Sequence, residues 1–298
     1  MSGSPLITVL LCFHNDRAYL ATAVRSILQQ TMKDFEFLIY DDASSDGSAE
    51  LLAAFGDPRI QLRRNQTNLG LTRTLNLGLL EARGQFLARM DGDDIADPQR
   101  LELQLQFMRE HRDVGLLGTS RTLIDESDRL IAHAPAQCDD LSIRFKSLLG
   151  NPFAHPSVFM RMEILRRHGL RYDESFPTAQ DYDLWVRMLM FTAGANLLQP
   201  LLKYRLRGGI SKNRKLEQLA SHDRISLRAI AAFAPGFSIQ AHELRQLRGR
   251  FGGHSVRDPS LDPADPYWQG RHAELRAAFI AHHRDHPDIG RFTVDYSG

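Results

Sequence analysis

Short apolar segments alternate with amphipathic segments from residue 6 to about residue 111, and no other feature restricts the fold of this chain as strongly. The apolar segments have the length and β-branched character of buried strands. The segments between them repeat apolar residues at helical spacing. The predicted strands are 6–13, 35–40, 60–63 and 85–90, and the predicted helices are 17–30, 48–55, 71–82 and a segment from Pro98 to about His111. This alternation predicts an α/β fold with a mostly parallel central sheet flanked by helices.

The second half of the chain has a looser pattern. The apolar stretch 114–124 indicates one strand or two, and helical patterning follows at 144–150, 161–168, 181–191, 215–232 and around 272–283. We therefore expect one domain over residues 1–214, made of the halves 1–112 and 113–214. A C-terminal helical extension is expected over 215–298.

Composition and charge exclude several classes of protein. Of the 298 residues, 43% are hydrophobic, and 37 basic against 36 acidic residues give a formal charge of +1. No basic stripe carries interleaved aromatic residues, so no nucleic-acid partner is expected. Cys12 and Cys138 are too few for a disulfide framework or a four-ligand zinc site. The run 6–13 is about half the length of a bilayer span and lacks the flanks of a signal peptide, so we expect a cytoplasmic protein.

Asp41 and Asp42 form the first accumulation of carboxylates, at the end of the second predicted strand. Open α/β sheets bind ligands at the carboxyl ends of their strands. A carboxylate there can accept a hydrogen bond from a base N–H or a ribose hydroxyl. The same residues also suit a turn, and Ser45 or Asp46 could cap the helix that follows, so both interpretations stay open.

Asp91, Asp93 and Asp94 form the second accumulation, directly after the strand 85–90. Carboxylates this close repel each other unless a cation or solvent screens them. A hard divalent cation prefers oxygen ligands and keeps room for substrate phosphates, and Gly92 allows the tight turn. The alternative is a solvated acidic loop that precedes a helix.

Asp181 lies in the third acidic segment, where Gln180, Asp181, Tyr182 and Asp183 enter a predicted helix. A carboxylate at a helix start can simply cap the helix. It can also serve as a general base beside an acceptor hydroxyl, and the pattern alone does not decide between the two.

Five segments together resemble the family 2 glycosyltransferases with the GT-A fold. They are 7–48, 68–104, 155–161, 179–188 and 201–211, in order along the chain. The first resembles the nucleotide-binding segment, the second carries a metal motif, and the others resemble acceptor-side segments. Within the second, GLTRTLNLG and ARMDGDD are typical of enzymes of bacterial surface-polysaccharide assembly. The resemblance implies a catalytic domain over 1–214, with a nucleotide- and metal-binding half at 1–112 and an acceptor-binding half at 113–214.

The resemblance also implies roles for individual residues. The residues implied in nucleotide binding are Cys12, His14, Asn15, Asp41, Asp42, Arg73 and Asp91. Asp93 and Asp94, with Asp91 as a further candidate, would hold Mn²⁺ or Mg²⁺, and Asp181 would be the catalytic base. The candidates for donor phosphate or acceptor contact are Arg205, Arg207, His155 and Trp185. A surface position for the arginines, Arg73 included, a buried loop position for His155 and a core position for Trp185 are the alternatives.

Two positions depart from the family pattern. Gln180 replaces the Glu that is common before the base, so like-charge repulsion should raise the pKa of Asp181 less. Arg207 replaces a frequent His; an arginine cannot ligate a metal, but it can neutralise a diphosphate through charge-assisted hydrogen bonds.

The resemblance implies an inverting transfer from a nucleotide diphosphate sugar, UDP-sugars first, to a glycan or lipid-linked glycan hydroxyl. The pathway would be bacterial O-antigen, capsule or exopolysaccharide synthesis. Peripheral contact with the inner face of the cell membrane and a homodimer are left open. A nucleotidyltransferase is an alternative, although the turn after the first strand lacks the usual glycine-rich phosphate loop. A catalytically impaired binding protein on the same fold is another.

Overall fold

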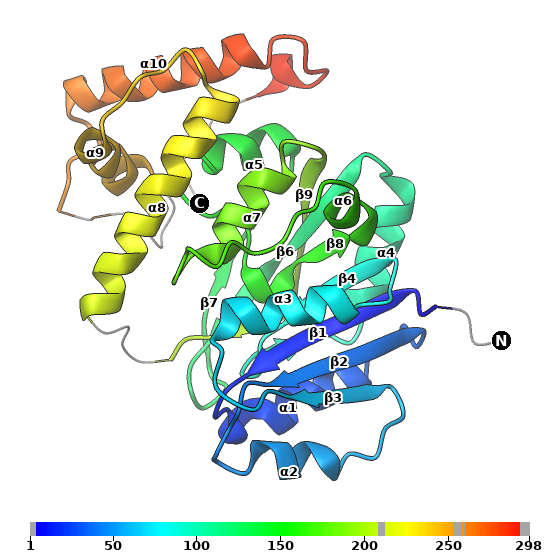
Figure 1. Ribbon diagram of the computed structural model, residues 1–298. Coiled ribbons are helices and arrows are strands. Elements are labelled where there is room, and N and C mark those ends of the chain that lie inside the picture. The colour runs from blue at the N-terminus through cyan, green and yellow to red at the C-terminus, as the bar shows by residue number, and fades with distance from the viewer. Residues whose placement is uncertain (1–3, 208–211, 253–257, 259, 293–298) are drawn as a thin grey trace.

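The computed structural model describes residues 4–207, 212–252, 258 and 260–292. Within these residues the chain forms a nine-stranded sheet with the order β3-β2-β1-β4-β8-β6-β9-β5, and β7 pairs with β6 outside this path. Helices cover both faces of the sheet, and three helices from the C-terminal part lie together at one end of the molecule (Figure 1). The predicted fold class is confirmed.

The first half of the sheet is parallel, as predicted. Its elements are β1 (Ile7–Phe13), α1 (Arg17–Leu28), β2 (Phe35–Asp41), α2 (Ser48–Ala53), β3 (Ile60–Arg64), α3 (Leu71–Glu81) and β4 (Phe86–Met90). β1 pairs in parallel with β2 and β4, and β2 pairs in parallel with β3. Every residue of β1 and β2 is buried. Helices on both faces leave central parallel strands no exposed side, which is why these strands are mostly apolar along their whole length.

The second half adds antiparallel pairs that the sequence pattern did not separate. Its elements are β5 (Ile95–Ala96), α4 (Arg100–Glu110), β6 (Val114–Ile124), β7 (Leu130–Ala134), α5 (Asp140–Lys146), η1 (His155–Ser157), β8 (Phe159–Arg161), α6 (Met162–Arg167), α7 (Gln180–Met188) and β9 (Ala193–Arg205). β8 runs antiparallel to β4 and β6, β7 runs antiparallel to β6, and β5 runs antiparallel to β9, whereas β6 and β9 are parallel.

Several predicted boundaries in this half are corrected. The stretch 114–124 is one continuous strand, and the helix predicted at 144–150 begins earlier because Asp139 caps it by accepting a hydrogen bond from the Ser142 N–H. The long strand β9 was not predicted. Its register against β6 shifts in several places, and such irregular strands lose the period-two alternation that marks a strand in sequence.

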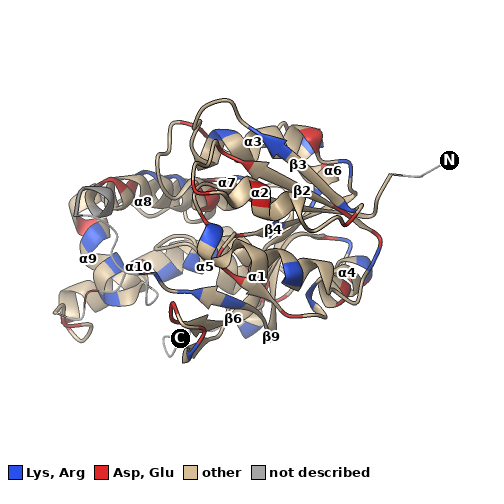
Figure 2. Ribbon diagram, turned by 90° about the horizontal axis from the view of Figure 1, so that it is seen from below, with Lys and Arg blue, Asp and Glu red and all other residues tan. Residues whose placement is uncertain are grey.

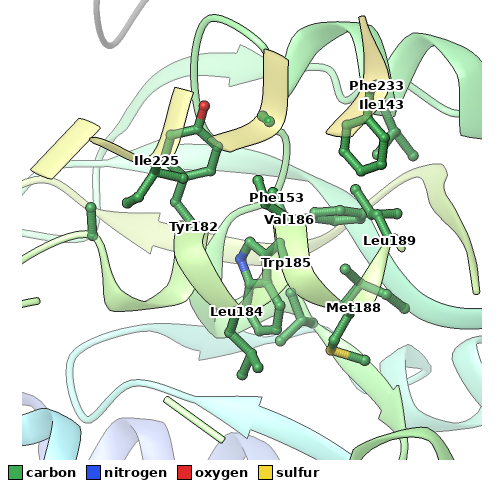
Figure 3. Packing of buried hydrophobic residues seen from close by; sticks show 14 of the residues in the cluster. Ile143, Phe153, Tyr182, Leu184, Trp185, Val186, Met188, Leu189, Ile225 and Phe233 are labelled. Atoms are coloured by element: carbon green, nitrogen blue, oxygen red, sulfur yellow. The ribbon is translucent and has the colours of Figure 1, made fainter. Parts of the chain in front are cut away.

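The C-terminal helices are α8 (Lys212–Phe233), α9 (Ala241–Phe251) and α10 (Pro266–His282), followed by η2 (Ile289–Arg291). They complete the same apolar cluster that contains residues of α5 and α7. Figure 3 shows this cluster around Trp185, with Ile225 and Phe233 of α8 beside side chains of α7. The helical extension is thus present, while its boundary at 214/215 stays a prediction. No helix among the described residues combines the length and apolar character of a membrane span.

Candidate active site

A cleft of about 640 Å³ opens where three parallel strands end. β1 and β2 finish in register, with Phe13 opposite Asp41, and Met90 at the end of β4 lies opposite Leu11. The loops that follow these strands therefore meet at one edge of the sheet. The cleft is lined by Cys12, Phe13, His14, Asp16, Asp42, Leu71, Thr74, Asp91, Asp93, Asp94, Tyr204, Arg205 and Arg207. Eight of the predicted site residues are among them, although they come from both ends of the catalytic segment.

His14 and Asn15 form the wall above β1. His14 Nδ1 lies 2.7 Å from the carbonyl oxygen of Asp42, and Asn15 Nδ2 lies 3.0 Å from His14 Nε2. Asn15 adopts a left-handed φ of 56° and ties the two loops together, because its N–H donates to Ser44 Oγ and its Oδ1 accepts from the Ser45 N–H. The exposed His14 ring is therefore held in place at the cleft, while Asn15 lies outside the lining.

The two adjacent aspartates at the end of β2 divide their tasks. Asp41 is fully buried, accepts a hydrogen bond from the Ser44 N–H and pairs with Arg64 at 3.3 Å. Asp41 does not line the cleft, and its side chain stabilises the turn that follows β2. Asp42 does line it, and its two oxygens accept hydrogen bonds from the Leu69 and Gly70 N–H groups, so it also holds the loop before α3.

The acidic turn after β4 places its three carboxylates in the cleft. Asp91 accepts a hydrogen bond from Arg89, whose side chain is fully buried beneath it. Burial, and then the charge of Asp91, raise the pKa of Asp93 to about 6. Burial, followed by the charges of Asp91 and Asp93, raises the pKa of Asp94 well above its ordinary value. A Cβ atom at Gly92 would lie 3.1 Å from Asp16 Oδ2, so glycine permits the close approach of the two loops here.

This turn suits a divalent cation whose coordination shell is completed by ligands from outside the protein. Asp94 Oδ1 accepts a hydrogen bond from the Arg205 N–H at 2.8 Å, but its buried Oδ2 has no hydrogen-bond partner among the described residues. A buried carboxylate oxygen without a partner is costly unless something binds it. No group of three or more His, Cys, Asp or Glu side chains within the described ranges is arranged to hold a metal. Mg²⁺ usually takes one or two carboxylates, with waters and substrate phosphates completing its shell, so the residues fit such an ion.

Arg205 and Arg207 close the cleft from β9, but they differ in what they leave available. Arg205 is 4% exposed, and its guanidinium donates to Asp93 O, Asp125 O and Asp128 Oδ1. It fastens β9 to neighbouring loops. Arg207, whose side chain is 39% exposed, bridges Asp16 at 2.7 Å and Asp93 at 2.8 Å. Only Arg207 of this pair has the freedom to turn toward a phosphate.

Asp181 lies in the first turn of α7 and outside the lining of this cleft. It is partly exposed, and its Oδ2 accepts a hydrogen bond from Asn151 Nδ2 at 2.7 Å. Burial is the main cause that raises its pKa, and the charge of Asp91 is a smaller contribution in the same direction. The residue before the helix, Ala179, has a left-handed φ of 59°, a strained conformation for a side chain with a Cβ.

Three other candidates lie away from the cleft lining. Trp185 is fully buried, which favours the core interpretation over a ring that stacks on a sugar. His155 Nε2 lies 2.9 Å from the Tyr172 hydroxyl, and desolvation lowers its pKa well below the ordinary value. Arg73 is exposed and pairs with Glu174 at 3.1 Å.

The structure also shows cleft or neighbouring residues that the pattern reading did not single out. Asp16 and Tyr204 line the cleft, and Arg89 supports Asp91 from below. Arg89 carried a usable signal, because a charged residue inside an apolar strand that leads to an acidic turn requires a partner. Asn151 carried none, since a lone amide in a loop does not indicate its partner.

The sequence model of the family described as Glycosyl transferase family 2 matches residues 8–169. The chain is 35% identical over 210 residues to EpsE of Bacillus subtilis (strain 168), which is named a glycosyltransferase, and the match covers 69% of this chain and 74% of EpsE. The chain belongs to glycosyltransferase family 2. A Haemophilus influenzae glycosyltransferase is 30% identical over 218 residues, covering 70% of this chain and 68% of its own.

Solved structures agree on the fold of this glycosyltransferase. S. aureus TarS (residues 1–349), in complex with UDP-GlcNAc, superposes with a TM-score of 0.64 at 16% identity, covering 95% of this chain and 88% of TarS. A mannosyltransferase from Pyrobaculum calidifontis, in complex with GDP-Man and Mn²⁺, superposes with a TM-score of 0.54 at 17% identity, covering 96% and 89%. The family, the enzyme class and the GT-A fold inferred from the resemblance are confirmed.

Proposed function

We propose that this glycosyltransferase moves a sugar from a nucleotide diphosphate donor to a hydroxyl of a glycan or lipid-linked glycan, with inversion at the anomeric carbon. The observation that carries the proposal is the acidic turn at the end of β4, where the buried Asp94 Oδ2 has no hydrogen-bond partner among the described residues and Arg207 lines the same cleft. UDP-sugars are the first candidates. The UDP-GlcNAc and GDP-Man in the two superposed structures support a nucleotide sugar of this general kind.

The donor would lie across the cleft with its base toward His14 and its diphosphate toward the acidic turn. Asp93 and Asp94 would hold Mn²⁺ or Mg²⁺, which as a Lewis acid supplies stabilisation of the charge that develops on the leaving diphosphate. Arg207 adds a second positive charge when it leaves Asp93 for the phosphates.

Asp181 would act on the acceptor side. Its raised pKa suits a group that must take a proton from a hydroxyl as the C–O bond forms. Asn151 keeps the carboxylate oriented through its hydrogen bond to Oδ2. The hydroxyl attacks the anomeric carbon opposite the departing nucleoside diphosphate, the glycosidic bond to phosphate breaks, and a single displacement inverts the centre.

The biological setting we propose is bacterial surface-polysaccharide synthesis at the cytoplasmic face of the membrane. The motifs GLTRTLNLG and ARMDGDD support this setting, and a lipid-linked acceptor would bring the enzyme into peripheral contact with the membrane.

A donor screen tests the proposal. Thermal unfolding is followed with a panel of UDP-, GDP- and dTDP-sugars, each with and without Mn²⁺, and release of nucleoside diphosphate is then measured for donors that raise the unfolding temperature. We expect metal-dependent stabilisation by one nucleotide class and slow cleavage with water as the acceptor. Stabilisation without any cleavage favours a binding protein that has lost catalysis, and no stabilisation by any donor contradicts the proposal.

A further inference from the structure

The two residues that follow Asp181 on α7 are held by α8. Tyr182 and Asp183 are both fully buried. The Tyr182 hydroxyl donates to the Ser147 carbonyl oxygen and lies 3.1 Å from Ser226 Oγ on α8. Asp183 pairs through Oδ1 with Arg228 of α8, and its Oδ2 accepts from Arg187 Nε at 2.8 Å. The first turn of α7 is therefore fixed from behind by a helix of the C-terminal extension.

A second connection joins the extension to the loop that carries Asn151, the hydrogen-bond partner of Asp181. Arg248 of α9 is 2% exposed, and its Nε donates to the Leu149 carbonyl oxygen at 3.1 Å. Leu149 lies two residues before Asn151, which donates to Asp181. Arg248 also bonds Asp223 Oδ1 at 2.6 Å, His222 O at 3.1 Å and Ser226 Oγ at 2.9 Å, all on α8. A planar guanidinium with donors in fixed directions thus joins α9, α8 and the loop that carries Asn151.

These contacts do not reach the nucleotide cleft. Every residue that lines the cleft belongs to the segments 12–94 and 204–207. Figure 2 shows both basic and acidic residues on the C-terminal helices. Arg228 of α8 pairs with Asp183 of α7, and Arg248 of α9 pairs with Asp223 of α8. The extension therefore contacts residues next to the proposed base and next to its partner Asn151, and these contacts involve no residue of the cleft lining.

We propose that α8 and α9 position the catalytic base, with Arg248 and Arg228 as positioning residues that act through Asp181. The inference rests on the proposed function, because it takes Asp181 as the base. A general base works only within hydrogen-bond reach of the proton it accepts, and a displacement of about 1 Å can cost on the order of 100-fold in rate. The C-terminal extension is on this view a part of the active site's support.

The test compares two variants with matched controls. Arg228→Gln removes the bond to Asp183, while Arg187 keeps that carboxylate paired, so the protein should fold. Its control is Arg224→Gln, one turn earlier on α8, where Arg224 stacks over the Phe176 ring at 4.3 Å. Arg248→Met removes the buried connection. Its control is Arg250→Met, whose guanidinium bonds Asp262 O and Gln246 within the extension.

The readouts are the rate of nucleoside diphosphate release from the panel donor that the wild type cleaves fastest, the affinity for that nucleoside diphosphate with Mn²⁺, and the unfolding temperature. We expect Arg228→Gln and Arg248→Met to lower kcat about 10-fold or more, with the nucleotide Kd changed less than about 2-fold. The control variants should keep the wild-type kcat, even where their unfolding temperature falls as much as that of Arg228→Gln or Arg248→Met. Arg228→Lys, which restores a cation opposite Asp183, should recover most of the rate.

A second comparison separates positioning from general stability. In an Asp181→Asn background, Arg228→Gln should lower the residual rate no further, because the residue it acts through is already gone. A wild-type kcat in both Arg228→Gln and Arg248→Met, while Asp181→Asn is inactive, overturns the inference but leaves the proposed function in place. Full activity of Asp181→Asn instead overturns the assignment of the base and the inference with it. If Arg248→Met does not fold, the Arg228 series alone decides.

Discussion

Asp93→Asn should stabilise the metal-free protein at pH 8, which is unusual for a substitution in an active site. The pKa of Asp93 is raised from 3.8 to about 6, mainly by burial and then by Asp91. Each pKa unit corresponds to about 1.4 kcal/mol, so the ionised carboxylate lowers the free energy of unfolding by about 3 kcal/mol. The side chain is 22% exposed, which makes this value an upper one.

The pH dependence follows from the sign of the shift. Because the pKa of the Asp93 carboxyl is higher in the folded than in the unfolded state, the folded state binds the proton more tightly. The penalty is complete above pH 6, declines as the pH falls from 6 toward 3.8, and vanishes below that range. The stability difference between Asp93→Asn and the wild type should therefore be about 3 kcal/mol at pH 8 and about half of that at pH 5.

Urea unfolding in the presence of a chelator, at both pH values, measures this difference. Asp97→Asn is the matched control, since the Asp97 side chain accepts a local hydrogen bond from the Gln99 N–H that the oxygen of Asn can also accept. Mn²⁺ should then stabilise the wild type more than Asp93→Asn. A variant that is less stable than the wild type at pH 8, with an unchanged pH dependence, would refute the electrostatic reasoning.

Three further substitutions test other parts of the site. Asp181→Asn should lower sugar transfer roughly 10²–10⁴-fold with nearly unchanged donor affinity, and unchanged turnover would remove Asp181 from the mechanism. In the wild type, the raised pKa of Asp181 should place the acid limb of kcat above the ordinary aspartate range, measured as nucleoside diphosphate release between pH 4 and 8. Arg207→Ala should weaken UDP binding about 10-fold in the presence of Mn²⁺, because a charge-assisted hydrogen bond is worth about 1.5–3 kcal/mol, and calorimetry at two salt concentrations checks it. Trp185→Ala should lower the free energy of unfolding by about 3–5 kcal/mol in urea, whereas an exposed sugar-stacking residue would cost little.

Hydrophobic periodicity and charged residue types predicted most of the acidic residues that line the cleft. The segments that form β1, β2 and β4 are buried on both faces, so most of their residues are apolar and the ends of the strands could be predicted. Since parallel strands bring their carboxyl ends to one edge of the sheet, the sequence alone predicts that Asp42 and the acidic turn at 91–94 lie close together there. The family resemblance added Asp181 and Arg207, which lie far from them in sequence.

The strands of residues 113–214 were harder to predict because their apolar residues follow no regular period. β9 pairs with β6 through shifts in register, and β8 is three residues long, so neither produces a regular alternation. The sequence also could not show that neighbouring residues of one type have different surroundings. Asp41 and Asp42 are chemically identical, but in the folded chain Asp41 lies in the interior and Asp42 lines the cleft. Arg205 and Arg207 differ in the same way.

The amino-acid sequence by itself determined the parallel half of the sheet, the place of the acidic turn and the family, because these depend on local periodicity and on side-chain types a few residues apart. Only the tertiary structure decided that Asp94 Oδ2 has no hydrogen-bond partner within the described part of the chain, that Arg207 bridges Asp16 and Asp93, and that Arg248 reaches the loop beside Asp181. These contacts join residues that are up to 191 positions apart. Their energies depend on burial and on direction in space, and neither quantity exists until the chain has folded.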